Sequence, residues 1–175
     1  MRSIDRLYQK VQTPYIFQLE DDWEFDGPIS WEAAKAILEM DKGVANVCVR
    51  KFGEIKEKYR NRSSRAFIGG EEFALMNRDA HPEWFAWSSN PGLIKTTLYN
   101  DFKPFGRVYG DQMSGIMKKA GLTQAWLLPG VARHIGQGRN VTDPTMPARA
   151  TKPLGKLSRR WKKNLYYLGL RRDPF

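Results

Sequence analysis

Three consecutive carboxylates, Glu20, Asp21 and Asp22, are the residues of this chain whose types and spacing most clearly suggest chemistry. They follow the short apolar run 15–19 and stand directly before a tryptophan. Clustered acids repel one another, and a divalent cation would compensate them, because hard cations bind carboxylate oxygens and often bridge to substrate phosphates. The pattern favours a metal site, and an acidic surface turn is the alternative.

Two further positions offer groups that could work beside such a metal. His134 lies between an apolar segment and a glycine-rich loop, with Arg133 and Arg139 close in sequence. Neutral imidazole is a frequent metal ligand, and the planar guanidinium suits phosphate recognition, although a purely structural histidine is the alternative. Asp111 stands at the start of a predicted helix, where it could cap the helix or take a proton from an acceptor hydroxyl as general base.

An aromatic segment, residues 84–90, has two interpretations. Its tryptophans and Phe85 could form a wall of the core, or a stacking floor for a sugar ring whose hydroxyls bind the polar neighbours Ser89 and Asn90. We predict that Phe85 belongs to the core, while both roles remain open for Trp84 and Trp87.

Short strands and helices alternate through most of the chain, which predicts a layered α/β domain. The run 15–19 is predicted to be a strand inside a mostly covered sheet, with the acids at its carboxyl end, where ligands bind in open α/β sheets. The charged segment 51–65 is expected to be an exposed loop rather than a phosphate-binding one. The other predicted elements are helices over 2–11, 31–40, 93–99 and 112–120, strands over 44–50, 123–128 and 131–134, a strand within 84–93, and a hairpin over 67–76.

Length and composition indicate one globular domain with a tail: the chain has 175 residues, of which 41% are hydrophobic. The single cysteine, Cys48, excludes an intrachain disulfide framework and a multi-cysteine zinc site, and its valine neighbours predict a buried strand thiol. The sequence lacks a membrane-spanning apolar run and the apolar core of a secretory signal, which predicts a cytoplasmic protein.

Positive charge is concentrated in the tail. The segment 149–175 carries +8 of the formal net charge of +10. Its apolar residues, among them Leu157 and Trp161, recur at helical spacing. A helix packed on its own domain is one interpretation. The other is a surface helix on an anionic membrane, peripheral at the inner face.

Four segments in this order resemble bacterial and viral glycosyltransferases of the family-2-like, GT-A type. They are Thr13–Phe25 with its acidic triplet, Asn90–Leu93, Gly110–Gly115 and His134–Gly136. The resemblance covers roughly residues 1–145. It implies a GT-A-like (Rossmann-like) mixed sheet with flanking helices over 1–145, followed by a basic helical tail over 146–175.

The resemblance also implies roles for the candidate residues. Asp22 would bind Mn²⁺ or Mg²⁺, Glu20 or Asp21 would face the ribose or the water around the metal, and His134 would reach the metal or the diphosphate. Asp111 would be the catalytic base of an inverting enzyme. Arg133 and Arg139 would assist in binding the diphosphate of a UDP- or GDP-linked sugar donor, and Trp87, Ser89 and Asn90 would line the acceptor and sugar pocket. The acceptor would be a glycan or a lipid-linked hydroxyl.

The chain departs from this family at its start. GT-A enzymes place a nucleotide-binding βαβ half before the acidic motif, whereas here one predicted helix precedes the motif strand. The expected fold is therefore a truncated or compact GT-A-like one, and a partner chain supplying the missing half, or a non-catalytic subunit, is an alternative. A basic nucleic-acid-binding protein is a rival from another class, but carboxylates oppose phosphate binding without a metal, so we do not expect a nucleic-acid partner.

Overall fold

The computed structural model describes residues 2–107, 110–136 and 153–172. The chain divides into two compact units, residues 1–140 and 141–175. The first unit holds all the candidate site residues.

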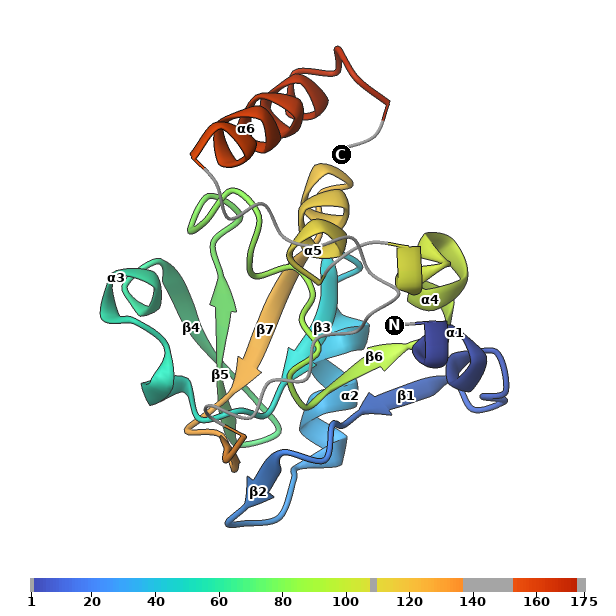
Figure 1. Ribbon diagram of the computed structural model, residues 1–175. Coiled ribbons are helices and arrows are strands. Elements are labelled where there is room, and N and C mark those ends of the chain that lie inside the picture. The colour runs from blue at the N-terminus through green and yellow to red at the C-terminus, as the bar shows by residue number, and fades with distance from the viewer. Residues whose placement is uncertain (1, 108–109, 137–152, 173–175) are drawn as a thin grey trace. The chain divides into compact units, whose positions relative to one another are not determined.

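A six-stranded mixed sheet forms the centre of the first unit (Figure 1). Its strand order is β1-β6-β3-β7-β5-β4. Strand β3 is parallel to β7, and β6 is antiparallel to both β1 and β3. Strands β1, β3 and β7 therefore run in one direction, and their carboxyl ends meet at one edge of the sheet. The strands are β1 (Tyr15–Gln18), β3 (Val44–Cys48), β4 (Ser63–Ile68), β5 (Glu71–Met76), β6 (Gly92–Lys95) and β7 (Thr123–Leu127).

A two-stranded antiparallel sheet extends this edge. It pairs β2 (Trp23–Phe25) with β8 (Ala132–His134), so that Trp23 lies opposite His134. Strand β2 follows β1 and the acidic triplet, and β8 follows β7. The small sheet therefore joins the two segments that follow these strands of the large sheet. The helices of the described residues are α1 (Arg2–Tyr8), α2 (Trp31–Met40), α3 (Glu57–Arg60), α4 (Thr96–Phe102), α5 (Gly110–Lys119) and α6 (Pro153–Tyr167), with short 3-10 turns at Phe52–Glu54 and Phe105–Arg107.

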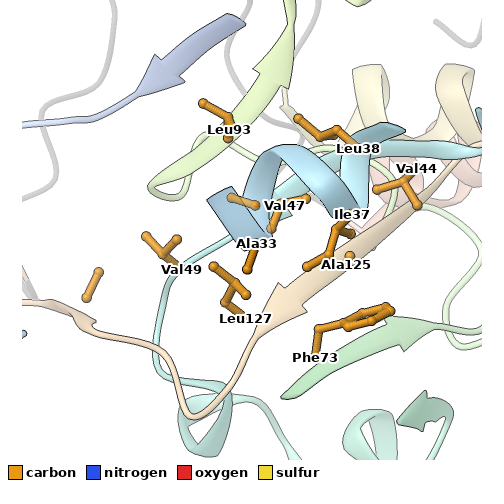
Figure 2. Close-up of a cluster of buried hydrophobic side chains, with 12 residues drawn as sticks. Ala33, Ile37, Leu38, Val44, Val47, Val49, Phe73, Leu93, Ala125 and Leu127 are labelled. Atoms are coloured by element: carbon orange, nitrogen blue, oxygen red, sulfur yellow. The ribbon is translucent and has the colours of Figure 1, made fainter. Parts of the chain in front are cut away.

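Helix α2 covers one face of the sheet (Figure 2). Its residues Ala33, Ala34, Ile37 and Leu38 are almost fully buried. They pack against strand residues such as Val47, Leu93 and Leu127. Burying side chains of this size contributes about 1.5–3 kcal/mol each, so this layer holds the strand ends rigidly.

Helices α1, α4 and α5 cover the opposite face. Tyr8, Leu98 and Met117 of these helices are buried with Ile94 of the sheet. Helix α1 is also tied by polar contacts, since the Asp5 carboxylate accepts hydrogen bonds from the backbone amides of the 3-10 turn before α5, at 2.8 and 2.7 Å. This turn is thereby fixed to the start of the chain.

The mixed α/β class is confirmed, and several local predictions are correct. Helix α2 has the predicted bounds 31–40, the hairpin is formed by β4 and β5, and Cys48 and Phe85 are buried. Burial raises the pKa of the Cys48 thiol to about 12, as expected for a structural cysteine rather than a nucleophile.

Four local predictions are wrong. Residues 93–95, predicted as the start of a helix, belong to β6, and α4 begins at Thr96. Strand β1 is an outermost strand of the sheet, paired on one side only, and not a central strand. The segment 84–90 is a bent loop, and the strand begins only at Gly92; Phe85 has a φ of 70°, which no strand residue adopts. Residues 51–65 contain a 3-10 turn, α3 and the start of β4 instead of a loop.

The second unit contains helix α6. Among the described residues, no helix combines the length and the apolar character needed to cross a membrane.

Candidate functional site

The carboxyl ends of three strands bring several candidate residues to one edge. Glu20, Asp21 and Asp22 follow β1, Arg50 follows β3, and Arg133 and His134 lie in β8 beyond β7. The loop that holds Ser89 leads into β6 at the same edge, because β6 is antiparallel to its neighbours. Residues far apart in the sequence thus come together because β1, β3 and β7 run in the same direction.

Asp22 and His134 form the polar centre of this edge. The Oδ2 atom of Asp22 lies 2.9 Å from Nε2 of His134, which is ion-pair or hydrogen-bond distance. The backbone reinforces the pair, since the Ile135 amide donates to the Asp22 carbonyl at 2.9 Å. The indole of Trp23 lies against the imidazole with a ring separation of 5.0 Å. Two residues predicted separately as metal ligands therefore touch.

Gly136 packs directly against the Asp22 carboxylate. A Cβ atom at this position would lie 2.5 Å from Oδ2 and 2.7 Å from the Cβ of Asp22. A contact of that length is prohibitive, so only glycine allows the loop after β8 to pass so close to the aspartate. This close packing against Asp22 explains why glycine occupies the last position of the His134–Gly136 motif.

Glu20 shares this edge with Asp22. Partial loss of solvation raises the pKa of the Glu20 carboxyl, and repulsion from the Asp22 carboxylate raises it further. The nearby polar groups of Trp23, His134 and Ser89 oppose this rise in pKa. The side chains of Glu20 and Asp22 therefore interact as like charges, which is the repulsion that the sequence suggested.

A cavity of about 430 Å³ lies beside Glu20, between α1, β1 and the loop 84–91. Its polar lining includes Gln18, Glu20 and Ser89, and its apolar lining includes Trp87. Gln18 is buried, accepts a hydrogen bond from the Tyr8 hydroxyl and donates to the Ser89 carbonyl at 3.1 Å. The cavity walls are thus held by hydrogen bonds.

Trp87 and Ser89 lie where a ligand in this cavity would touch them. Trp87 is almost fully buried, and its indole N–H has no acceptor among the described residues. The indole of a cavity-lining residue thus has an unused hydrogen-bonding capacity. Asn90 is half-buried in the same loop and does not line the cavity.

Asp111 lies in the first turn of α5, and this helix packs against the cavity loop. The hydroxyl of Ser114 accepts hydrogen bonds from the backbone amides of Ala86 and Trp87, at 3.1 and 3.2 Å. Gly110 lies beside the Trp87 ring, since a Cβ there would be 3.5 Å from it. Helix α5 therefore positions the tryptophan of the cavity, and Asp111, in its first turn, is not among the residues that line the cavity.

The remaining predicted residues are placed as follows. Asp21 is exposed in the turn between β1 and β2. Arg133 is exposed and paired with Glu24 across the small sheet, and this carboxylate raises the pKa of the guanidinium. Arg139 lies outside the described residues.

Arg50 is a site residue that sequence reasoning missed. It follows β3, its guanidinium lies 5.5 Å from the centre of the Trp23 ring, and its Nε donates to Glu54 at 2.8 Å. Its position after a buried strand was the available signal, but it was obscured by the charged segment that follows. The Arg50 guanidinium therefore contacts Trp23, and Trp23 in turn contacts the His134 ring of the Asp22–His134 pair.

His81, the other histidine, lies in a different environment. Its Nδ1 accepts hydrogen bonds from the amides of Glu83 and Trp84, both at 3.1 Å. The ring stacks on Trp84 at 4.1 Å and also contacts Tyr59. The His81 imidazole thus stabilises the turn 81–84 by accepting hydrogen bonds from its backbone.

Asp22 and His134 fit a divalent cation as a pair of protein ligands. Atom Oδ1 of Asp22 is buried and has no hydrogen-bond partner among the described residues, so its lone pairs are available. No group of three or more His, Cys, Asp or Glu side chains suited to a metal ion occurs in residues 2–107, 110–136 and 153–172. Such a pair suits a cation that takes its other ligands from phosphate oxygens and water, as Mg²⁺ commonly does.

Comparisons with protein families, with curated proteins and with solved structures gave no significant match.

Proposed function

We propose that residues 1–145 form a metal-dependent, inverting glycosyltransferase domain of the GT-A-like type. The observation that carries the proposal is the Asp22–His134 pair, which lies at the carboxyl ends of β1 and β8 next to Glu20 and its cavity. A nucleotide-sugar donor, linked to UDP or GDP, needs a site for its diphosphate and an adjoining space for its sugar. The edge of the sheet offers both.

Asp22 and His134 are the residues that would hold Mn²⁺ or Mg²⁺. The bound cation would supply Lewis-acid stabilisation of the negative charge on the departing diphosphate. The chain's own cations support the same task, because Arg50 and Arg133 lie at this edge and guanidinium groups bind phosphate oxygens well. Gly136, which has no Cβ, leaves room for the Asp22 carboxylate beside His134.

Asp111 is proposed as the general base. It would accept the proton of the acceptor hydroxyl while the acceptor oxygen forms a bond to the anomeric carbon and the bond from this carbon to the diphosphate oxygen breaks. Attack opposite the leaving group inverts the configuration, and no covalent intermediate with the protein is needed. The contact of α5 with Trp87 supports this assignment, since it brings the helix of Asp111 to the cavity.

The cavity beside Glu20 is proposed to receive the sugar. Trp87 offers an apolar ring and an indole N–H without an acceptor in the described chain, and Gln18, Glu20 and Ser89 offer polar groups. Sugars combine an apolar ring face with hydroxyls, and they bind to aromatic side chains bordered by hydrogen-bonding groups. The acceptor would be a glycan or a lipid-linked hydroxyl.

Thermal-shift measurements with UDP, GDP and their sugar conjugates, with and without Mn²⁺ or Mg²⁺, test the proposal. At least one nucleotide should raise the Tm only when the metal is present, and Asp22→Ala should abolish this rise. Glu32→Ala is the matched control, because it removes a carboxylate at an exposed position on α2. A wild-type chain that responds to no nucleotide, or an Asp22→Ala variant that responds equally, contradicts the proposal.

A second measurement separates a transferase from a non-catalytic subunit of the same fold. Asp111→Asn should retain the metal-dependent Tm shift but lower sugar transfer by about 10²–10⁴-fold, the usual contribution of a general base. Metal-dependent nucleotide binding by the wild-type chain without any transfer to glycan or lipid-linked acceptors would favour the non-catalytic subunit.

A further inference from the structure

Helix α6 has two chemically distinct faces. Leucines and a tryptophan recur every three or four residues along one side and continue just past its end: Leu154, Leu157, Trp161, Leu165 and Leu168. An α-helix turns 100° per residue, so this spacing forms one continuous stripe. The polar residues Ser158 and Asn164 stand at the two borders of the stripe, and none lies within it.

This apolar stripe is exposed. Leu154 is 81% exposed and Trp161 is 65% exposed, and Leu157 and Leu168 are exposed to a similar degree. Single exposed apolar residues are ordinary, but a row of four on one helix leaves a continuous apolar surface in water, which marks an interaction site.

The opposite side of α6 is strongly basic. It carries Lys156, Arg159, Arg160, Lys162 and Lys163, and the sequence has no acid from 153 to 172. At 100° per residue, Lys156, Arg159 and Lys163 lie on the far side of the helix from the leucines, and Arg160 and Lys162 flank the stripe on its two sides. The apolar stripe of α6 is therefore bordered by basic side chains that attract anions.

We propose that α6 lies on the surface of an anionic phospholipid bilayer. Its leucines and Trp161 would enter the boundary between headgroups and acyl chains, and its Lys and Arg side chains would bind lipid phosphates. A nucleic acid would use the cations but would leave the stripe in water, because nucleic-acid interfaces are polar and charged. Of these two anionic partners, lipid is the one that uses both faces of the helix.

Co-sedimentation of the full chain with vesicles tests this proposal. Binding to phosphatidylcholine vesicles containing 30% phosphatidylglycerol, roughly the anionic fraction that makes surface charge matter, should far exceed binding to pure phosphatidylcholine. Added salt should weaken it, since screening shortens the reach of the charges. Trp161→Glu should lower the partition coefficient by more than about ten-fold, because it puts a charge in the apolar stripe.

The basic face is tested by the triple variant Lys156→Gln, Arg160→Gln, Lys162→Gln. Each cation near an anionic surface contributes about five-fold, so the triple variant should bind about a hundred-fold more weakly. The matched controls lie in the first unit: Phe67→Glu changes an exposed aromatic residue of β4, and Lys10→Gln, Lys42→Gln, Lys56→Gln removes three exposed lysines. Both controls should bind vesicles like the wild-type chain.

Three results would overturn the proposal. Equal binding of Trp161→Glu and the wild-type chain would assign lipid binding to another surface. Binding to duplex or single-stranded nucleic acid but not to vesicles would make α6 a nucleic-acid element. Self-association that Trp161→Glu abolishes, without vesicle binding, would show that a second copy covers the stripe.

Discussion

The two histidines of this chain lie beside tryptophans, yet their partners differ in kind. His134 contacts Trp23 and the carboxylate of Asp22, at the edge where three strands end. His81 stacks on Trp84 and accepts two backbone amides in a turn. An imidazole whose nitrogen is used by backbone amides has a structural task, whereas one that faces a carboxylate with a free oxygen can bind a ligand. Neighbouring side chains, rather than residue type, separate the two roles.

The largest expected difference concerns ligand binding. His134→Ala should weaken metal-dependent nucleotide binding by roughly 100-fold, the upper end of losses seen when the support of a metal site is removed. His81→Ala should change this affinity less than about two-fold, because it lies outside the site. Titration calorimetry with Mn²⁺ present measures both. Equal effects of the two substitutions would remove the distinction between them.

Gly136→Ala should sharpen the assignment by disturbing the same pair indirectly. The new methyl group would occupy the space of the Asp22 carboxylate, so the carboxylate must move away from His134. We expect metal-dependent nucleotide affinity to fall about ten-fold, comparable to the loss of a supporting contact. Gly53→Ala is the control, because a Cβ there meets nothing within 4 Å. If Gly136→Ala binds normally, the close packing on Asp22 has no part in the site.

For thermal stability, we expect the larger effect from substituting His81 and the smaller one from substituting His134. His81→Ala leaves the amides of Glu83 and Trp84 without their acceptor and removes a stacked ring, and a lost hydrogen bond of this kind costs about 1 kcal/mol. For a chain of this size the Tm should fall by roughly 2–4 °C. His134→Ala should lower the Tm less, since its bond is to a side chain at the surface. Thermal unfolding of both variants without metal measures the difference.

The smallest effect is expected at Glu20. Burial and the Asp22 carboxylate raise its pKa in the folded chain, so the folded state favours the protonated acid. Its ionisation therefore opposes folding as the pH rises through the raised pKa, and this cost is absent below the ordinary carboxyl pKa. Glu20→Gln should raise the Tm at pH 7 by less than the roughly 2–4 °C that 1 kcal/mol produces, because solvent screens a residue this exposed.

The pH dependence provides the check on that prediction. The difference in Tm between Glu20→Gln and the wild-type chain should vanish at about pH 3.5, below the unperturbed pKa of glutamate. A Tm difference that persists there would mean that packing, not charge, explains the variant.

Elements with a strong periodic pattern could be predicted from the sequence, and elements set by tertiary contacts could not. Helix α2 follows from its apolar spacing, and its bounds are correct. The loop 84–90 has the aromatic composition of a strand, but Phe85 takes a positive φ and the backbone amides of Ala86 and Trp87 bond to Ser114 of α5. That contact spans 28 positions of sequence and leaves no local signature.

The segment 51–65 failed for a different physical reason. Strand β4 is an edge strand whose central residues are all exposed, so it lacks the alternation of buried and polar residues that identifies strands. Its Arg65 is held by Glu72 of β5 and lies over the Phe52 ring. In the site, the adjacency of Asp22 and His134 could be proposed from the resemblance, whereas Arg50 required the strand order to be known.

The contact between Asp5 and the turn at Phe105 and Gly106 couples the first helix to the helix of the proposed base. Two backbone amides on the path to α5 depend on a single carboxylate near the amino terminus. Fraying of α1 would release both amides and remove one wall of the cavity at the same time. Deuterium uptake by these two amides should therefore report on the opening of α1 and of the cavity wall that it forms.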